Sequence, residues 1–97
     1  MSHRVVFRPQ AADELLDAAR WYEANREGLG ADFLEAVDVA VQRIQDAPLT
    51  FPVVHETIRR VILKRFPYGI YFRVQKPEIV VLAVMHSRRD PRRWQSR

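Results

Sequence analysis

The chain has 97 residues, of which 47% are hydrophobic and 29% are charged. This composition is typical of one soluble globular domain and excludes a disordered chain. The absence of cysteine excludes a disulfide framework and thiolate metal sites, and no apolar run is long enough to span a bilayer. The first residues lack the pattern of a signal peptide. We therefore expect a single domain over residues 1–97, located in the cytoplasm and not bound to a membrane.

Charge is divided unevenly along the chain. The net charge is +4, but residues 10–47 include nine acidic and three basic residues, whereas residues 48–97 include three acidic and eleven basic residues. A basic half-domain suits an anionic partner, either a nucleic acid or an acidic protein segment. A solvated basic surface with no dedicated partner is the alternative interpretation.

The chain opens with a predicted strand followed by a helix. Residues 4–8 have the composition of a short strand, which Pro9 ends. Residues 10–26 then carry apolar side chains at spacings of three and four, which places them on one face of a helix. The sequence therefore predicts an amphipathic helix directly after the first strand.

A second helix is predicted after a glycine-containing break. Residues 28–30 (G-L-G) interrupt the apolar periodicity, which resumes over residues 31–47 until Pro48 stops it. Asp32 and Glu35 are placed where they could form a capping arrangement at the start of this helix. Two amphipathic helices joined by a short break indicate an antiparallel helical hairpin.

The second half predicts a loop, three strands and a basic tail. Residues 49–56 have the composition of an ordered loop, and strands are expected over residues 57–64, 69–74 and 78–86. Short turns containing proline separate the strands. The tail, residues 87–97, contains five arginines and one tryptophan.

These elements predict an α+β fold with the order β-α-α-β-β-β. The last three strands are joined by short turns and should form an antiparallel meander, which the first strand joins after the hairpin. Residues 79–85 contain no polar side chain, so both faces of that strand should be covered, as in the centre of a sheet. We expect a four-stranded, mostly antiparallel sheet with the helical hairpin packed on one face.

Three segments carry a resemblance to a known family. They are V-V-F-R-P-Q-A-A-D-E-L from residue 5, F-P-Y-G-I-Y-F-R-V from residue 66, and I-V-V-L-A-V-M-H-S-R-R-D-P-R-R-W from residue 79. In this order and spacing the chain resembles the RelE/ParE toxin superfamily from about residue 4 to residue 94. The resemblance implies the toxin of a type II toxin–antitoxin system, with the helical hairpin and sheet predicted above.

The resemblance leaves two functions open. RelE-like toxins are ribosome-dependent endoribonucleases that cut messenger RNA, whereas ParE-like toxins inhibit DNA gyrase without known covalent chemistry. Toxins of both kinds are neutralised by a cognate antitoxin, the product of an adjacent gene, and the antitoxin binds the operator DNA. No cofactor is implied. The histidines are scattered and cysteine is absent, so no metal site is expected either.

Ribonuclease chemistry would need a proton-transfer group and cations beside the phosphate. His86 is the candidate for proton transfer because histidine titrates near neutral pH, and Arg60 and Arg88 are the candidate cations. A histidine that is hydrogen-bonded to structure at the end of a strand is the alternative for His86. Arg88 and Arg89 could instead lie on a solvated surface or form salt bridges with Asp90 or with the acidic hairpin.

Three departures from the RelE-like pattern favour the ParE-like function. The pattern places arginine, lysine and tyrosine where this chain has Gly69, Ile62 and Trp94. We therefore expect a gyrase-binding toxin with no catalytic residues. Arginine and tryptophan often anchor protein interfaces, although Trp94 could instead pack the tail onto the sheet. The predicted target-binding residues are Arg60, Lys64, Arg73, His86, Arg88, Arg89, Arg92, Arg93 and Trp94.

Overall fold

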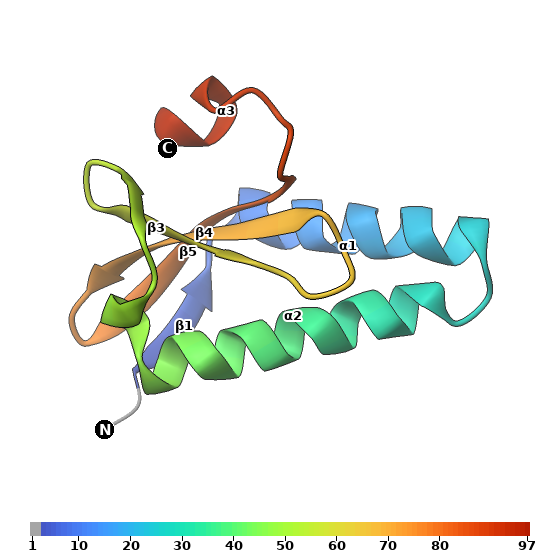
Figure 1. Ribbon diagram of the computed structural model, residues 1–97, viewed down its shortest axis with the longest axis horizontal. Helices are drawn as coiled ribbons and strands as arrows, with labels where there is room; N and C mark the ends of the chain where they lie inside the picture. The colour runs from blue at the N-terminus through green and yellow to red at the C-terminus, as the bar shows by residue number, and fades with distance from the viewer. Residues whose placement is uncertain (1–2) are drawn as a thin grey trace.

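A helical hairpin packs on one face of a five-stranded sheet in the computed structural model, which describes residues 3–97 (Figure 1). The α+β class and the order of the predicted elements are confirmed. Three short elements, β2, α3 and the 3-10 turn, were not predicted. The helices and strands are β1 (Arg4–Phe7), α1 (Pro9–Asn25), α2 (Leu29–Asp46), a 3-10 turn (Pro48–Thr50), β2 (Val53–His55), β3 (Ile58–Ile62), β4 (Tyr68–Gln75), β5 (Glu78–His86) and α3 (Arg92–Gln95).

The start of α2 differs from the prediction. The helix begins at Leu29 after Gly28, whose φ of 87° places it in the left-handed region that favours glycine, and no side chain within α2 caps it. The carboxylate of Glu23, on α1, instead accepts the N–H groups of Gly28 and Gly30, each at 3.0 Å. The predicted capping by Asp32 and Glu35 is therefore wrong, because the cap comes from the preceding helix.

The strand order in the sheet is β1-β5-β4-β3-β2. β1 pairs in parallel with β5, and the other pairs are antiparallel. The sheet therefore has a fifth strand, β2, in addition to the four predicted. β2 has three residues, lies at the edge of the sheet, and falls in the segment predicted to be a loop. So short a strand after Pro52 has no periodicity from which to predict it.

β5 is the buried strand of the sheet, as its composition predicts. It lies between β1 and β4, and its seven inner residues are all buried. A β-bulge interrupts its pairing with β4: Val81 pairs with Phe72 and Ala83 pairs with Tyr71, so Leu82 has no partner residue. Side chains that follow the bulge therefore point to the face opposite to the one that strict alternation predicts.

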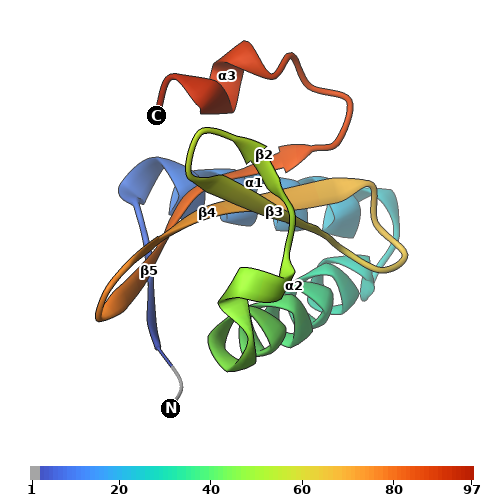
Figure 2. The ribbon, with the colours of Figure 1, turned by 60° about the vertical axis from the view of Figure 1, so that its left-hand side comes forward.

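The C-terminal segment covers the second face of the sheet (Figure 2). Trp94, on α3, is 4% exposed and stacks on Tyr71 of β4, with 4.4 Å between ring centroids. Around this pair lies an apolar cluster separate from the core beneath the hairpin, formed by Ile58, Tyr71, Val80, Leu82, Ala83, Met85 and Trp94. The sheet is thus covered on both faces. In residues 3–97, no helix has the length and apolar character needed to cross a membrane.

Replacing Trp94 by alanine should lower the free energy of unfolding by about 3–5 kcal/mol, because a large buried ring is lost. Urea denaturation monitored by far-UV circular dichroism measures this loss. Trp21→Ala is the matched control, since Trp21 is 60% exposed and its removal should cost less than about 1 kcal/mol. Equal losses in the two variants would show that the C-terminal segment does not cover the sheet.

Candidate functional site

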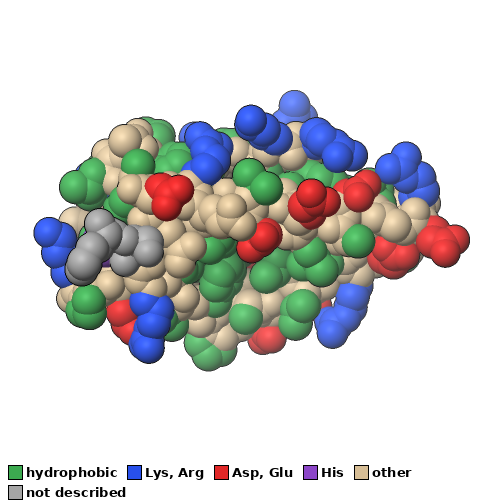
Figure 3. Space-filling view, turned by 90° about the horizontal axis from the view of Figure 1, so that it is seen from below, with side chains coloured by type: hydrophobic (Ala, Val, Ile, Leu, Met, Phe, Trp, Pro, Cys, Tyr) green, Lys and Arg blue, Asp and Glu red, His purple; other side chains and the backbone are tan. Residues whose placement is uncertain are grey.

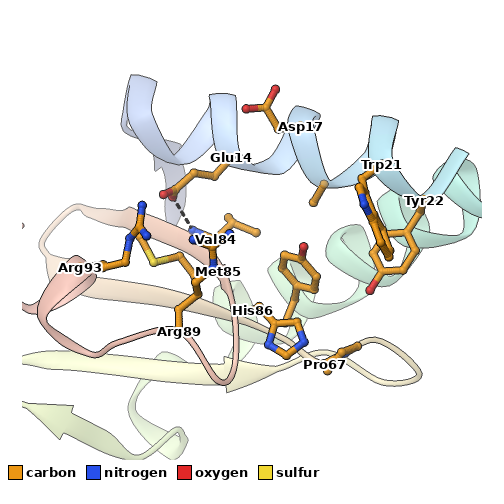
Figure 4. Close-up of a pocket in the computed structure, with 12 residues that line it drawn as sticks. Glu14, Asp17, Trp21, Tyr22, Pro67, Val84, Met85, His86, Arg89 and Arg93 are labelled. Atoms are coloured by element: carbon orange, nitrogen blue, oxygen red, sulfur yellow. Dashed lines mark hydrogen bonds between the residues drawn. The ribbon is translucent and has the colours of Figure 1, made fainter. Parts of the chain in front are cut away.

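A groove of about 750 Å³ opens between α1, the C-terminal end of β5 and the segment that leads to α3 (Figure 4). We call it the His86 groove. It lies beside the part of β5 that extends past β1, whose pairing ends at Phe7 and Val81. The lining residues are Glu14, Asp17, Ala18, Trp21, Tyr22, Pro67, Tyr68, Val84, Met85, His86, Arg89 and Arg93.

His86 ends β5 and points toward the helical hairpin. It pairs with Tyr68 across the sheet, and their ring centroids are 5.6 Å apart. Its Nδ1 accepts the backbone N–H of Arg88 at 3.1 Å. A neutral His86 therefore carries its proton on Nε2, which leaves Nε2–H as the ring's remaining polar group.

The wall formed by α1 is aromatic toward the hairpin turn. Tyr22 contacts Tyr68, with ring centroids 5.9 Å apart, and burial raises the pKa of Tyr22, with a further rise from the charge of Tyr68. Its hydroxyl is therefore neutral at physiological pH. Trp21 lies beside Tyr22, and 60% of it is exposed. Trp21 was not among the predicted target-binding residues, although a tryptophan beside Tyr22 in the first predicted helix could have indicated an aromatic surface.

The two walls of the groove have opposite charges. Glu14 and Asp17 lie on α1, and Arg89 and Arg93 lie on the C-terminal segment. Both arginines are exposed, and neither forms an ion pair in the part of the chain that the structure describes. These two cations are therefore free to contact a partner.

The structure does not bring the proposed ribonuclease residues together. Arg60 pairs with Tyr71, so it lies on the face covered by the C-terminal segment, whereas His86 lies on the hairpin face. Strict alternation would have placed His86 on the same face as Arg60. The bulge at Leu82 reverses the direction of the residues after it, so Arg60 and His86 cannot act on one phosphate from these positions.

Comparison with known proteins identifies the family. Residues 5–91 match the family described as the ParE toxin of the type II toxin–antitoxin system parDE. The chain belongs to the ParE toxin family. Toxin ParE2 of Mycobacterium tuberculosis is 27% identical over 92 residues, which cover 94% of this chain and 88% of that protein. Membership of the RelE/ParE superfamily, inferred from three segments of sequence, is thus confirmed.

Solved structures show the same fold. A chain from the chromosomal ParDE toxin–antitoxin system of P. aeruginosa matches with a TM-score of 0.72 and 21% identity, over 88% of this chain and 96% of that one. A chain from the RelBE2 toxin–antitoxin complex of Mycobacterium tuberculosis matches with a TM-score of 0.59 and 18% identity, over 89% of this chain and 99% of that one.

The other predicted target-binding residues of this ParE-family toxin are dispersed. Arg73 lies on the face of Arg60 and donates to the hydroxyl of Thr57 at 3.1 Å. Lys64 follows β3 and lines a smaller groove against α2. Arg92 pairs with Asp90 at 2.7 Å, and this hydrogen bond lowers the pKa of Asp90.

Arg88 and Trp94 do not line the His86 groove, and each contacts other parts of the fold instead. The backbone of Arg88 holds the His86 ring, and the Arg88 side chain is exposed outside the groove lining. Trp94 is buried against Tyr71, so the packing interpretation of this residue is confirmed. Of the nine predicted residues, the groove therefore includes His86, Arg89 and Arg93.

Gly69 occupies a place with little room for a side chain. A Cβ atom built on it would lie 3.1 Å from Cε1 of Tyr71, on the face that Trp94 covers. The arginine that RelE-like toxins carry at this position would meet the Tyr71 ring. The close packing of the Tyr71 ring against Gly69 is therefore consistent with the absence of an arginine at this position.

We expect Gly69→Ala to lower the free energy of unfolding by about 1–3 kcal/mol, because the added methyl group forces the Tyr71 ring to move. Differential scanning calorimetry of the purified protein measures the change. An unchanged midpoint would show that the Tyr71 ring shifts freely and that Gly69 does not restrict this face.

Proposed function

We propose that this ParE-family toxin inhibits DNA gyrase by binding it, without covalent chemistry. The observation that carries the proposal is the separation of His86 from Arg60 on opposite faces of the sheet. Cleavage of RNA needs a proton-transfer group and phosphate-binding cations at one point. Protein binding needs only an accessible surface with residues that anchor interfaces.

The His86 groove supplies such a surface. Trp21 is 60% exposed at its α1 wall, and Arg89 and Arg93 are exposed at the opposite wall. Tryptophan and arginine are among the residues that most often dominate interface energies. The name of the relative Toxin ParE2 and the ParE family match also favour the ParE-like function.

We also propose that a cognate antitoxin binds this chain and that operator DNA is reached only through the antitoxin. The structural neighbours come from a ParDE system and a RelBE2 complex, which supports a partner of this kind. Leu34 and Val39 are exposed apolar side chains on α2, and Figure 3 shows hydrophobic side chains among charged ones on one face of the molecule. They suit a protein partner present alongside the toxin in the cytoplasm.

The alternative function is cleavage of messenger RNA on the ribosome. One observation favours it: His86 lines the same groove as Arg89 and Arg93, so a histidine and two cations are available there without Arg60. This arrangement would use different cations from those that the sequence predicted.

One experiment separates the two functions. Purified toxin is added to gyrase with relaxed plasmid, and in parallel to ribosomes translating a defined message. We expect loss of supercoiling and an intact message, and supercoiling should be retained when the antitoxin is added first. Cleavage of the message in the ribosomal A site, lost in His86→Ala, would overturn the gyrase proposal and establish the ribonuclease.

A further inference from the structure

The last residue of the chain is attached to the first helix by a partly buried ion pair. Arg97 donates from Nη1 and Nη2 to the two carboxylate oxygens of Glu14, at 2.8 and 2.9 Å. The side chains are 14% and 23% exposed, respectively. This bidentate geometry joins residues that are 83 positions apart, and it is stronger than a single surface contact.

Both partners also bond to the free edge of β5. Glu14 Oε1 accepts the backbone N–H of Val84 at 3.0 Å, and Arg97 Nη1 donates to the carbonyl oxygen of Leu82 at 3.2 Å (Figure 4 shows the first contact). These are backbone groups that lie past the end of β1, where a buried unpaired group would be costly. Glu14 and Arg97 therefore replace the missing neighbour strand at this edge.

We propose that Glu14 and Arg97 form a clasp that fixes the C-terminal segment and thereby positions Arg89 and Arg93 beside the His86 groove. The inference rests on the proposed function, in that the positioned arginines are those proposed to contact the target. Glu14 acts as a positioning residue for these arginines. Apart from Ser87 at its start, the segment is attached by the stacking of Trp94 on Tyr71, by the clasp, and by a long hydrogen bond from Arg8 Nη1 to the carbonyl oxygen of Arg97 at 3.4 Å.

The geometry of the segment explains why a clasp would matter for Arg89 and Arg93. Ser87 N–H donates to the carbonyl oxygen of Pro67 at 2.7 Å and holds the start of the segment, but from Arg88 to Trp94 the backbone bonds are short-range turns, such as Arg89 N–H to His86 and Arg93 N–H to Asp90, both at 3.0 Å. Such local bonds shape the segment but do not hold it on the sheet. Loss of the clasp should leave the stacking of Trp94 on Tyr71 as the main attachment after Ser87 and allow the arginines to move away from the groove more often.

The test uses Glu14→Gln, Arg97→Ala and the double variant in the full chain. Glutamine keeps an acceptor for the Val84 N–H but loses the charged pair. Amide hydrogen exchange of Trp94 and Gln95 should become about tenfold faster in each single variant, since a charge-assisted bond of this kind shifts an equilibrium by about that factor. The double variant should exchange no faster than the single ones. Slow amides of β5 report that the domain remains folded.

Two matched variants make the result specific. Asp13→Asn removes a carboxylate next to Glu14 from an exposed position on the same helix and should leave the exchange of the tail unchanged. Arg97→Lys keeps the charge without the bidentate geometry and should restore part of the protection. Unchanged exchange of Trp94 in both Glu14→Gln and Arg97→Ala would overturn the clasp.

Growth arrest after induced expression tests whether the clasp positions Arg89 and Arg93 for activity, and this test does not require the target to be known. Glu14→Gln and Arg97→Ala should need more toxin than the wild type for the same growth arrest, by the factor by which the fraction of molecules with an attached segment falls. A tail that is released while growth arrest stays at the wild-type level would overturn the positioning role. Growth arrest by the wild-type toxin with intact gyrase supercoiling would refute the gyrase proposal alone and leave the result on the clasp valid.

Discussion

Replacement of Val81 by aspartate should abolish folding. Val81 is fully buried on β5, beneath the helical hairpin, and in residues 3–97 the cluster around it includes no buried charged side chain. An unpaired carboxylate at such a position costs several kcal/mol, which is comparable to the whole stability of a small domain, about 5–15 kcal/mol. We expect a far-UV spectrum of an unfolded chain and no cooperative transition in urea.

The control is the same substitution on an exposed strand residue. Val53 lies on the edge strand β2 and is 50% exposed, so Val53→Asp should change the free energy of unfolding by about 0.5 kcal/mol or less. A Val81→Asp protein that unfolds cooperatively at the wild-type midpoint would contradict the placement of β5 in the core.

Where the sequence predicted this fold correctly, the signal was local. The run of apolar residues in β5 could be assigned to a covered strand because no polar residue interrupts it, and Gly28 marked the turn of the hairpin because its φ of 87° suits glycine. The predictions failed where a contact comes from outside the element concerned. The cap of α2 comes from Glu23 on the preceding helix, and the packing of Trp94 on Tyr71, which the sequence offered only as an alternative, depends on tertiary contacts.

The candidate site was predicted in part for a related reason. Alternation along a strand assigns side chains to faces only while the pairing is regular. Because Leu82 has no partner residue, the side chains that follow it in β5 point to the face opposite to the one that alternation predicts. His86 therefore lies on the other face of the sheet from Arg60. Nothing in the composition of the apolar run marks the position of this bulge. The exposed arginines of the tail were found from composition, whereas the ion pair of Arg97 with Glu14 depends on tertiary contacts.

Reversing the charges of Arg89 and Arg93 should strongly weaken inhibition of gyrase and leave the domain folded. Both side chains are exposed on one wall of the His86 groove and lack ion-pair partners within residues 3–97. Arginines at the centre of an interface contribute about 2 kcal/mol or more each when removed. For Arg89→Glu/Arg93→Glu we therefore expect at least about a hundredfold rise in the concentration of toxin that halves supercoiling.

A control with the same change in charge separates specific contact from long-range attraction. Arg26→Glu/Lys76→Glu alters two exposed cations outside the groove, and in both double variants the net charge falls from +4 to zero, because each exchange removes two units. The control should inhibit gyrase with a modest loss that disappears as salt is raised, because distant charges act mainly through screened steering. Equal losses in the two double variants would mean that net charge drives binding and that the groove is not the contact surface. A large loss confined to Arg89→Glu/Arg93→Glu and maintained at high salt would place the target against this wall.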